Sequence, residues 1–261
     1  MTSSRATLAS VAAVTLLLAC VAGCGPAAIP AVSVARSRLL EGLLGHWAFD
    51  EGSGTTVKDR SGNSYDGQLS GGTWVTGGRF KGGLRLVPGD TVTIPGFPQA
   101  TADWTVSVWI KMSKEDVAAF TSARAVVLSA ERPSMGGWEI EFDPRPGFEW
   151  LEASYYVTTP STDYIVLDCK CIETDRWLHF TAVFDTTHTQ ISLYHDDVLV
   201  DRATLPQPIV PDGAPDLTVG HWISASERPI SGVIDDYAIW TRALTADEVA
   251  AIDAQPVPDP P

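Results

Sequence analysis

Three acidic residues at alternate positions are the part of this sequence that comes nearest to a catalytic arrangement. Glu139, Glu141 and Asp143 fall in a strand-like stretch, where alternate side chains share one face of a sheet. Carboxylates gathered on one face can serve as nucleophile and acid/base catalyst in glycoside hydrolysis. However, Pro144 and Pro146 end the strand early, and a solvated strand face is the simpler interpretation.

Other catalytic patterns are absent from the sequence. It contains no nucleophile elbow, no paired zinc-binding histidines and no phosphate-binding loop. The histidines show no metal-ligand spacing; they are His46, His179, His188, His195 and His221. We therefore assign no catalytic residue and predict that the protein is not an enzyme.

Two of the four cysteines lie close together in the second half of the chain. Cys169 and Cys171 lie within a strand-like stretch, Val166 to Ile172, and residues two apart on a strand lie about 6.6 Å apart, near the upper limit for a disulfide. A disulfide and two buried thiols both stay open as interpretations. Zinc is disfavoured, because His179 is the only histidine near them in the sequence.

Composition and charge narrow the class of protein. The 261 residues include 18 basic and 32 acidic side chains, for a formal net charge of -14. Such a field repels phosphate backbones, so we exclude nucleic acid as a partner. The 22 glycines, 18 prolines and 9 tryptophans favour short strands joined by turns around aromatic side chains.

The N-terminus has the layout of an export signal. Arg5 supplies positive charge, residues 8–18 form an apolar run too short to span a bilayer, and small residues follow. The run ends in Val21-Ala22-Gly23-Cys24, which resembles the lipobox of bacterial lipoproteins. This resemblance implies that residues 1–24 are a lipoprotein signal peptide and that the lipid is attached at Cys24.

Alternatives to this anchor stay open. A rival box ends at Cys20, although the bulky Leu18 departs from the pattern, and ordinary cleavage would give free secretion. Gly25 stands where an aspartate would resemble an inner-membrane retention signal, which favours the outer membrane if the host has one. We expect a lipid-anchored protein of the cell envelope, with secretion as the alternative.

The chain after the signal reads as one domain between two spacers. Residues 25–38 form a Pro/Ala-rich linker, and residues 255–261 form a Pro-rich tail. Period-two alternation between them predicts half-buried strands; the apolar positions are Val106, Val108, Ile110, Phe180, Ala182, Phe184, Ile191 and Leu193. Asp196 and Asp197 fit a two-residue hairpin turn, and Thr245 with Glu248 forms the capping box of one short C-terminal helix.

The order of several sequence blocks resembles a known family, the bacterial laminin G-like jelly rolls of the concanavalin A-like lectin/glucanase superfold. The blocks are His46 to Gly54, Asp59 to Asn63, Trp104 to Lys111, Arg176 to Asp185, Ile191 to Val200, Leu217 to Gly220 and Gly232 to Leu244. The resemblance implies an all-β fold over residues 39–254, an antiparallel two-sheet sandwich. Asp197 departs from the family's usual hairpin glycine, and residues 143–171 do not align.

Calcium is the cofactor that the sequence favours. Asp50, Asp59 and Asn63 lie in or beside a Gly-Ser-Thr-rich loop, and carboxylate and amide oxygens are ligands for this hard cation. The resemblance implies that the first strand pairs near the last, which would bring Asp235 to the same loop as part of a structural calcium site. Ordinary turn residues and exposed strand acids are the alternative.

A non-catalytic binding or adhesion domain is the function that we favour from sequence. Its partner would be carbohydrate or a cell-surface protein, with exposed aromatics stacking on sugar; the candidates are Trp74, Trp138, Trp150 and Tyr155. The alternative is a structural envelope protein or an assembly subunit without a soluble ligand. A glucanase is least favoured, because that family's catalytic strand places Asp between two Glu, unlike Glu139, Glu141 and Asp143.

Overall fold

The computed structural model describes residues 35–98, 102–119, 125–129, 138–143, 150–156, 164–169, 171–204, 216–220 and 229–260. The predicted signal peptide, residues 1–24, and its lipid-attachment residue Cys24 lie outside this described part. In the residues that are described, no helix has the length and apolar character needed to cross a membrane.

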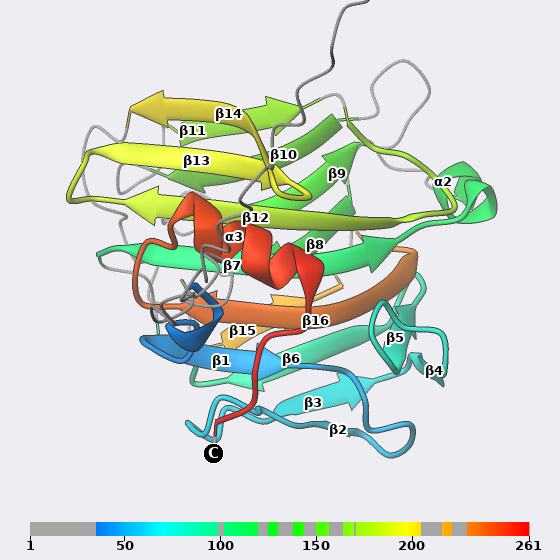
Figure 1. The fold of residues 1–261 in the computed structure, drawn as a ribbon. Helices are drawn as coiled ribbons and strands as arrows, with labels where there is room; N and C mark the ends of the chain where they lie inside the picture. The colour runs from blue at the N-terminus through cyan, green and yellow to red at the C-terminus, as the bar shows by residue number, and fades with distance from the viewer. Residues whose placement is uncertain are drawn as a thin grey trace, which may run out of the picture.

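The described residues form two antiparallel sheets stacked face to face (Figure 1). This confirms the predicted two-sheet jelly-roll sandwich. Sheet A has the order β14 (Val198–Thr204), β13 (Gln190–His195), β12 (Trp177–Asp185), β7 (Trp104–Lys111), β16 (Gly232–Trp240), β5 (Gly83–Leu86) and β4 (Thr73–Val75), with β1 (Leu43–Trp47) also paired to β16. Sheet B has the order β11 (Tyr164–Cys169), β10 (Trp150–Tyr156), β9 (Trp138–Asp143), β8 (Ala125–Ser129), β15 (Asp216–Val219), β6 (Thr91–Pro95), β3 (Gly67–Ser70) and β2 (Thr56–Val57).

The main core lies between the sheets and uses the predicted alternation. Val106, Val108 and Ile110 of β7 are fully buried there, opposite sheet B residues such as Val92 and Val219. Since successive side chains on a strand point to opposite faces, the odd-numbered residues of β7 point away from sheet B. The same alternation on β12 turns its odd-numbered residues to that outer face, because Leu178 to Phe184 contribute their even-numbered side chains to the core.

Strands β7, β12 and β13 of sheet A are buried on both faces, so the prediction that they are half-buried is wrong. A second apolar cluster covers part of the outer face; it includes Val183 of β12, Ala238 and Trp240 of β16, and Val249 and Ile252 of α3 (Ala246–Ala254). Figure 1 shows α3 lying across β7, β12 and β16. The helix is the predicted one, with Thr245 and Glu248 forming the capping box.

The segments on either side of the predicted domain also take part in the fold. Leu39 is fully buried, and Ala35, inside the predicted linker, is nearly so. The C-terminal tail is extended, but it lies against sheet A and is not a free spacer: Val257 is buried and its backbone N–H donates to Asp236 at 2.9 Å.

Two elements were not foreseen from the sequence. The stretch 143–171, which does not align with the family, supplies β10 and β11 and so extends sheet B beyond β9. A second short helix, α2 (Lys114–Ala119), follows β7. The Ser113 hydroxyl accepts from the N–H of Asp116 at 3.0 Å, and the Asp116 carboxylate accepts from the N–H of Ser113 at 2.8 Å. This reciprocal capping at the helix start explains why so short a helix forms.

Candidate functional site

A bulge in β16 brings two consecutive carboxylates to the same side of sheet A. The pairing of β16 with β7 shifts register between Asp235 and Ala238, and Asp236 has a left-handed backbone with φ of 47°. Aspartate tolerates this conformation better than most residues with a side chain. As a result Asp235 and Asp236 both line one small cavity, where a regular strand would point them to opposite faces.

This cavity, which we call the carboxylate cavity, has a volume of about 70 Å³. Its polar lining residues are His46, Asp50, Arg60, Lys81, Asp235, Asp236 and Asp259. His46 Nε2 lies 2.7 Å from Asp236 Oδ1, and both side chains are almost completely buried. The volume holds water but is too small for a sugar or a nucleotide, so this cavity is an internal polar cluster of the fold.

Two carboxylates that line this cavity hold a glycine-rich loop, residues 78–82, which joins β4 to β5. Gly82 N–H donates to Asp50 Oδ1 at 2.8 Å, and Phe80 N–H donates to Asp235 Oδ2 at 3.1 Å. The loop is so tight that a Cβ on Gly78 would lie 1.4 Å from the carbonyl oxygen of Gly82, so only glycine fits there. Asp50 and Asp235 therefore hold the segment that carries Arg79.

Burial raises the pKa of Asp235 to about 7, and the adjacent Asp236 carboxylate adds to the rise. The N–H groups of Phe80 and Arg79 donate to Asp235 and oppose the shift in part. Asp235 thus changes charge near neutral pH, unlike an ordinary aspartate.

A larger cavity opens on the outer face of sheet A beside the C-terminal end of α3. We call it the Trp177 cleft; its volume is about 370 Å³, and it is lined by Arg79, Trp109, Arg176, Trp177, Asp196, Asp197 and Asp253. These residues come from the 78–82 loop, β7, the start of β12, the β13–β14 turn and α3. The volume falls within the range of about 300–1,000 Å³ that is typical of small-ligand pockets.

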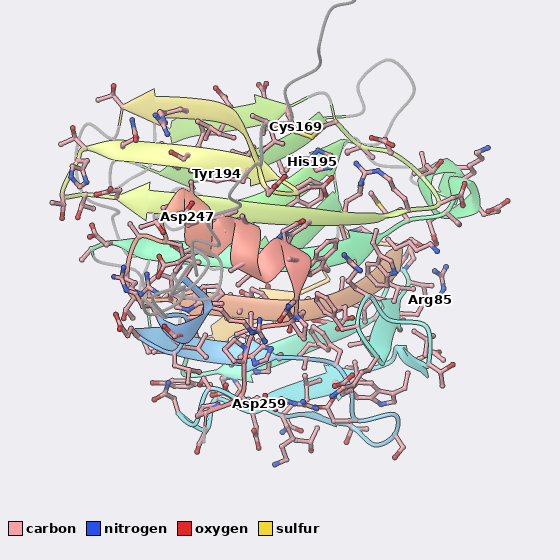
Figure 2. All side chains as sticks on the ribbon, in the orientation of Figure 1. Arg85, Cys169, Tyr194, His195, Asp247 and Asp259 are labelled. Carbon is pink, nitrogen blue, oxygen red and sulfur yellow. A yellow bond between two sulfur atoms is a disulfide. The ribbon has the colours of Figure 1, made fainter. Side chains whose placement is uncertain are left out.

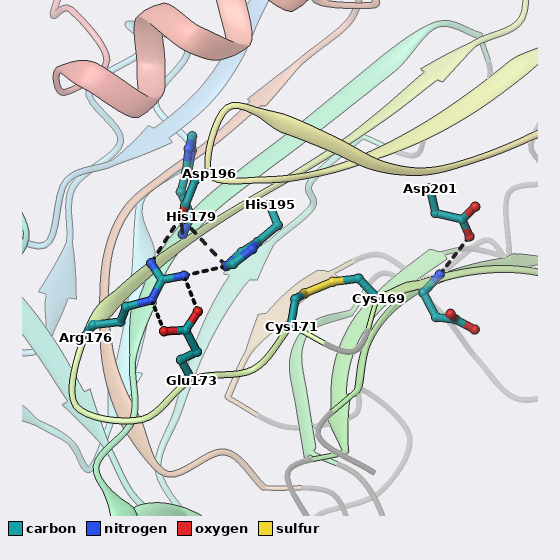
Figure 3. The surroundings of a disulfide bond; sticks show 9 residues. Cys169, Cys171, Glu173, Arg176, His179, His195, Asp196 and Asp201 are labelled. Carbon is teal, nitrogen blue, oxygen red and sulfur yellow. Dashed lines mark hydrogen bonds and ion pairs between the residues drawn. A yellow bond between two sulfur atoms is a disulfide. The ribbon is translucent and has the colours of Figure 1, made fainter. Parts of the chain in front are cut away.

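One wall of the Trp177 cleft is a rigid ion-pair network, drawn in Figure 3. Arg176 Nη1 lies 3.1 Å from Asp196 Oδ2, and Arg176 Nε lies 2.9 Å from Glu173 Oε2. Asp196 Oδ1 accepts from His179 N–H at 3.2 Å and so ties the hairpin turn to β12. Asp196 has φ of 55°, which agrees with the strained two-residue turn predicted at Asp196 and Asp197.

The floor of the cleft is an aromatic stack. The Trp109 ring lies parallel to the His179 ring with centroids 4.5 Å apart, and the Arg79 guanidinium carbon lies 4.3 Å from the Trp109 centroid. His179 in turn contacts Ser107 Oγ through Nε2 at 2.7 Å and Asp253 Oδ1 through Nδ1 at 3.1 Å. This chain of contacts has the connectivity of a Ser-His-Asp triad, but Ser107 and His179 are each only 1% exposed, so it joins α3 to the sheet.

The predicted calcium ligands do not gather around one point. Asp59 and Asn63 do not line the cavity that Asp50 and Asp235 share. The Asp59 carboxylate accepts hydrogen bonds from the N–H groups of His46, Ser61 and Tyr65 at 2.8–3.0 Å, as expected for a residue that stabilises a turn. The Asn63 amide donates to the carbonyls of Leu43 and Leu44, at 3.0 and 2.9 Å.

The charges around Asp50 also fit a cation poorly. Arg60 and Lys81 lie 3.3 and 3.6 Å from Asp50 Oδ2 and already neutralise it. Among the described residues, no group of three or more His, Cys, Asp or Glu side chains is arranged to hold a metal ion. Calcium at Asp50, Asp59, Asn63 and Asp235 thus stays a prediction that this donor set does not favour.

Cys169 and Cys171 form a disulfide in the structure, with Cα atoms 5.3 Å apart. The separation is shorter than the strand value expected from sequence because β11 ends at Cys169, so Cys171 lies beyond the extended path. The disulfide lies at the edge of sheet B, near Glu173 and the network of Arg176 (Figure 3).

The acidic strand does not present an open catalytic pair. Glu141 on β9 is fully buried, so the interpretation of a solvated strand face is wrong at this position. The neighbouring core residue Ile140 points between the sheets, which places Glu141 on the other face of sheet B. The side chains of Glu139 and Asp143 lie outside the described part of the structure.

Sequence reasoning chose different aromatic residues from those that line the cleft. Trp74 packs partly buried against the core, and its Nε1–H donates to the Gly54 carbonyl at 2.9 Å. The side chains of Trp138, Trp150 and Tyr155 lie outside the described part. Trp177 was missed because it starts a strand whose other residues read as core; its position opposite the Asp196–Asp197 turn becomes visible only when β12 and β13 are paired.

Comparison with known proteins places this fold in a class. The family profile for laminin G-like domains of the concanavalin A-like lectin/glucanases superfamily matches residues 87–250, well over half of the chain. The chain therefore belongs to this superfamily. No curated protein matches it in sequence.

Solved structures share the fold at low sequence identity. The receptor binding domain of botulinum neurotoxin D has a TM-score of 0.64 and 14% identity, over 83% of this chain and 53% of that one. Domain 4 of AbnA, an extracellular arabinanase from Geobacillus stearothermophilus solved with arabinotriose, has a TM-score of 0.61 and 20% identity, over 82% and 98%. The chain thus spans about half the length of the toxin domain and nearly all of the arabinanase domain.

Proposed function

We propose that this chain is a non-catalytic carbohydrate-binding domain displayed at the cell surface, and that the Trp177 cleft is its binding site. The observation that carries the proposal is the composition of this cleft, where the indole of Trp177 borders a cavity lined by Arg79, Asp197 and Asp253. Aromatic rings beside charged hydrogen-bonding groups match the alternating apolar and hydroxyl surfaces of a sugar ring.

The comparisons support the binding class without naming a ligand for this chain. One of the similar structures is a toxin receptor binding domain, one is an arabinanase domain in complex with arabinotriose, and one is a toxin ligand binding domain in complex with N-acetylneuraminic acid, with a TM-score of 0.64 and 15% identity. Glu141, the central acid of the glucanase-like strand, is buried and does not reach a sugar as the chain stands. This supports recognition in place of hydrolysis.

A glycan array with the purified chain tests the proposal. We expect saturable binding to at least one glycan class, and we expect the substitution Trp177→Ala to weaken it by roughly tenfold or more, because truncating a tryptophan that anchors a bound partner costs about 2 kcal/mol or more. A matched control is Trp74→Phe, on a tryptophan outside the cleft. Silence of the folded protein on the array would favour the alternative of a structural envelope protein.

We further propose that acylation of Cys24 holds the domain to the cell envelope. Two or more acyl chains give stable anchoring, which the lipobox pattern supplies. The substitution Cys24→Ala should move the protein from the membrane fraction to the soluble fraction, whereas Cys20→Ala should not. Release by Cys20→Ala alone would assign the anchor to the rival box.

A further inference from the structure

Within the proposed function, we infer the charge class of the ligand: the Trp177 cleft takes a neutral or cationic saccharide and discriminates against uronic acids. The inference rests on which polar groups of the cleft are already used and which are left for a ligand. It deepens the proposed function and therefore depends on carbohydrate binding at this site.

The Arg176 side of the cleft is fully engaged within the protein. Its guanidinium contacts Glu173, Asp196 and the Trp177 carbonyl. Asp196 uses both carboxylate oxygens, one on Arg176 and one on the N–H of His179. These groups form a wall, and a ligand would have to break several charge-assisted bonds to use them.

The groups left over are of both charges. Arg79 contacts the rings of Phe80 and Trp109, and no carboxylate among the described residues forms an ion pair with it. In the same described part, the Asp197 carboxylate forms no hydrogen bond or ion pair, and Asp253 uses only Oδ1, on His179. The cleft thus offers one cationic donor and carboxylate acceptors from two residues.

A buried donor adds to this set. Trp109 is only 3% exposed, and its Nε1 atom has no hydrogen-bond partner in the described part of the chain. An unsatisfied buried N–H is unfavourable, and an acceptor from a ligand or a water would relieve this cost. Because His179 and Arg79 already lie against the Trp109 ring, the stacking surface for a sugar is Trp177 and not Trp109.

Hydroxyl groups fit this mixture because each one both donates and accepts a hydrogen bond. A uronate would satisfy Arg79 but bring a third negative charge to Asp197 and Asp253. An ammonium group would face Arg79 but also two carboxylates, so its net interaction with these groups is attractive. Because the uncommitted groups carry one positive and two negative charges, a uronate meets more repulsion than attraction, whereas a hydroxyl group does not.

Calorimetric titration of the purified chain with three trisaccharides of similar size tests the inference. The probes are cellotriose, trigalacturonate and the chitosan trimer, which are neutral, anionic and cationic. We expect trigalacturonate to bind at least tenfold more weakly than cellotriose and the chitosan trimer. Asp197→Asn should strengthen trigalacturonate binding several-fold, and Arg79→Ala should strengthen binding of the chitosan trimer.

Exposed residues away from the cleft supply the controls. Asp247→Asn and Arg202→Ala remove the same charges elsewhere and should leave the order of the three affinities unchanged. Binding of trigalacturonate as tight as that of the other two, lost on Trp177→Ala, would overturn this charge class while leaving the proposed function intact. If no saccharide binds, or if Trp177→Ala and Arg79→Ala both leave binding unaltered, the proposed site itself fails.

Discussion

At the scale of single residues, the carboxylates of sheet A differ widely because their surroundings differ. Asp116 and Asp235 are both nearly fully buried. Burial alone would raise the pKa of Asp116, but Arg85, Ser231 and Ser113 hold it well below the usual range. Asp235 has backbone donors and no cation that outweighs burial, so its pKa moves in the opposite direction. The partner of a buried acid therefore decides whether its pKa is raised or lowered, and so whether its ionisation favours or disfavours the folded state.

Asp235 should make the stability of the protein depend on pH. Its folded pKa is raised, so its stabilising contribution is complete below pH 4 and is lost as pH rises through 7. We expect Asp235→Asn to raise the melting temperature at pH 8, where the buried charge is removed, and to change it little at pH 4. Each kcal/mol corresponds to about 2–4 °C for a domain of this size. Equal shifts at both pH values would contradict this account, and Asp247→Asn is the exposed control.

The effect of the Arg85–Asp116 pair on stability should depend on pH in the opposite direction to that of Asp235, because the pKa of Asp116 is lowered. Arg85 Nη2 lies 2.5 Å from Asp116 Oδ1, at the α2 end of sheet A, where Figure 2 labels Arg85. We expect Arg85→Met to destabilise the fold by about 1–3 kcal/mol at pH 7, less than for a fully buried pair because Arg85 is about a third exposed. The lowered pKa of Asp116 means that this difference should shrink below pH 4. Urea titrations at pH 7 and pH 3 measure it.

Sequence patterns predicted the features that depend on residues close to one another in the chain. The capping box at Thr245 and Glu248, the turn at Asp196 and the core alternation of β7 are all local, and the structure has them. The cleft could not be predicted, because Arg79, Trp177 and Asp253 meet only through pairing of distant strands and docking of α3. The bulge at Asp236, which sets the carboxylate cavity, likewise arises between β16 and β7.

At the scale of elements, a covering helix and a clamped loop set the outer face of sheet A. Alternation along β7 and β12 correctly predicted which side chains face the inner core, but it did not predict that the outer face is also buried. The apolar stripe of α3 is too short to indicate from sequence which strands the helix covers. The glycines of the 78–82 loop are visible in the sequence, but the hydrogen bonds that hold the loop are not. The sequence predicts Asp50 and Asp235 as cation ligands, whereas in the structure they accept hydrogen bonds from the backbone of this loop.

Calcium should therefore have little effect on the protein. Both carboxylate oxygens of Asp59 already accept hydrogen bonds, the Asn63 amide donates to backbone carbonyls, and Asp50 is neutralised by Arg60 and Lys81. We expect the melting temperature to stay within about 1 °C between millimolar Ca²⁺ and excess EDTA. By contrast, a calcium site with Ca²⁺ at 100 times its Kd would add about 2.7 kcal/mol to the free energy of unfolding. A rise of several degrees that Asp59→Asn abolishes would establish the calcium site instead.

At the scale of the whole molecule, the two sheets are joined at one edge as well as through the core. The N–H of Asp168 on β11 donates to Asp201 Oδ2 on β14 at 3.1 Å, across the sheets. The Cys169–Cys171 disulfide follows directly, and the network of Glu173 and Arg176 comes next along the chain (Figure 3). The segment from β11 to β12 therefore connects the sheet B edge to the wall of the cleft.

The place of β16 in sheet A has a consequence for the order of events during synthesis. This strand begins at Gly232, yet it pairs with β7 along one side and with β1 and β5 along the other. A ribosome has therefore released nearly the entire polypeptide before the middle of that sheet exists, and β7, β5 and β1 each wait with an unpaired edge. Premature termination before Gly232 would leave no partly working product, only exposed edges that invite aggregation or proteolysis.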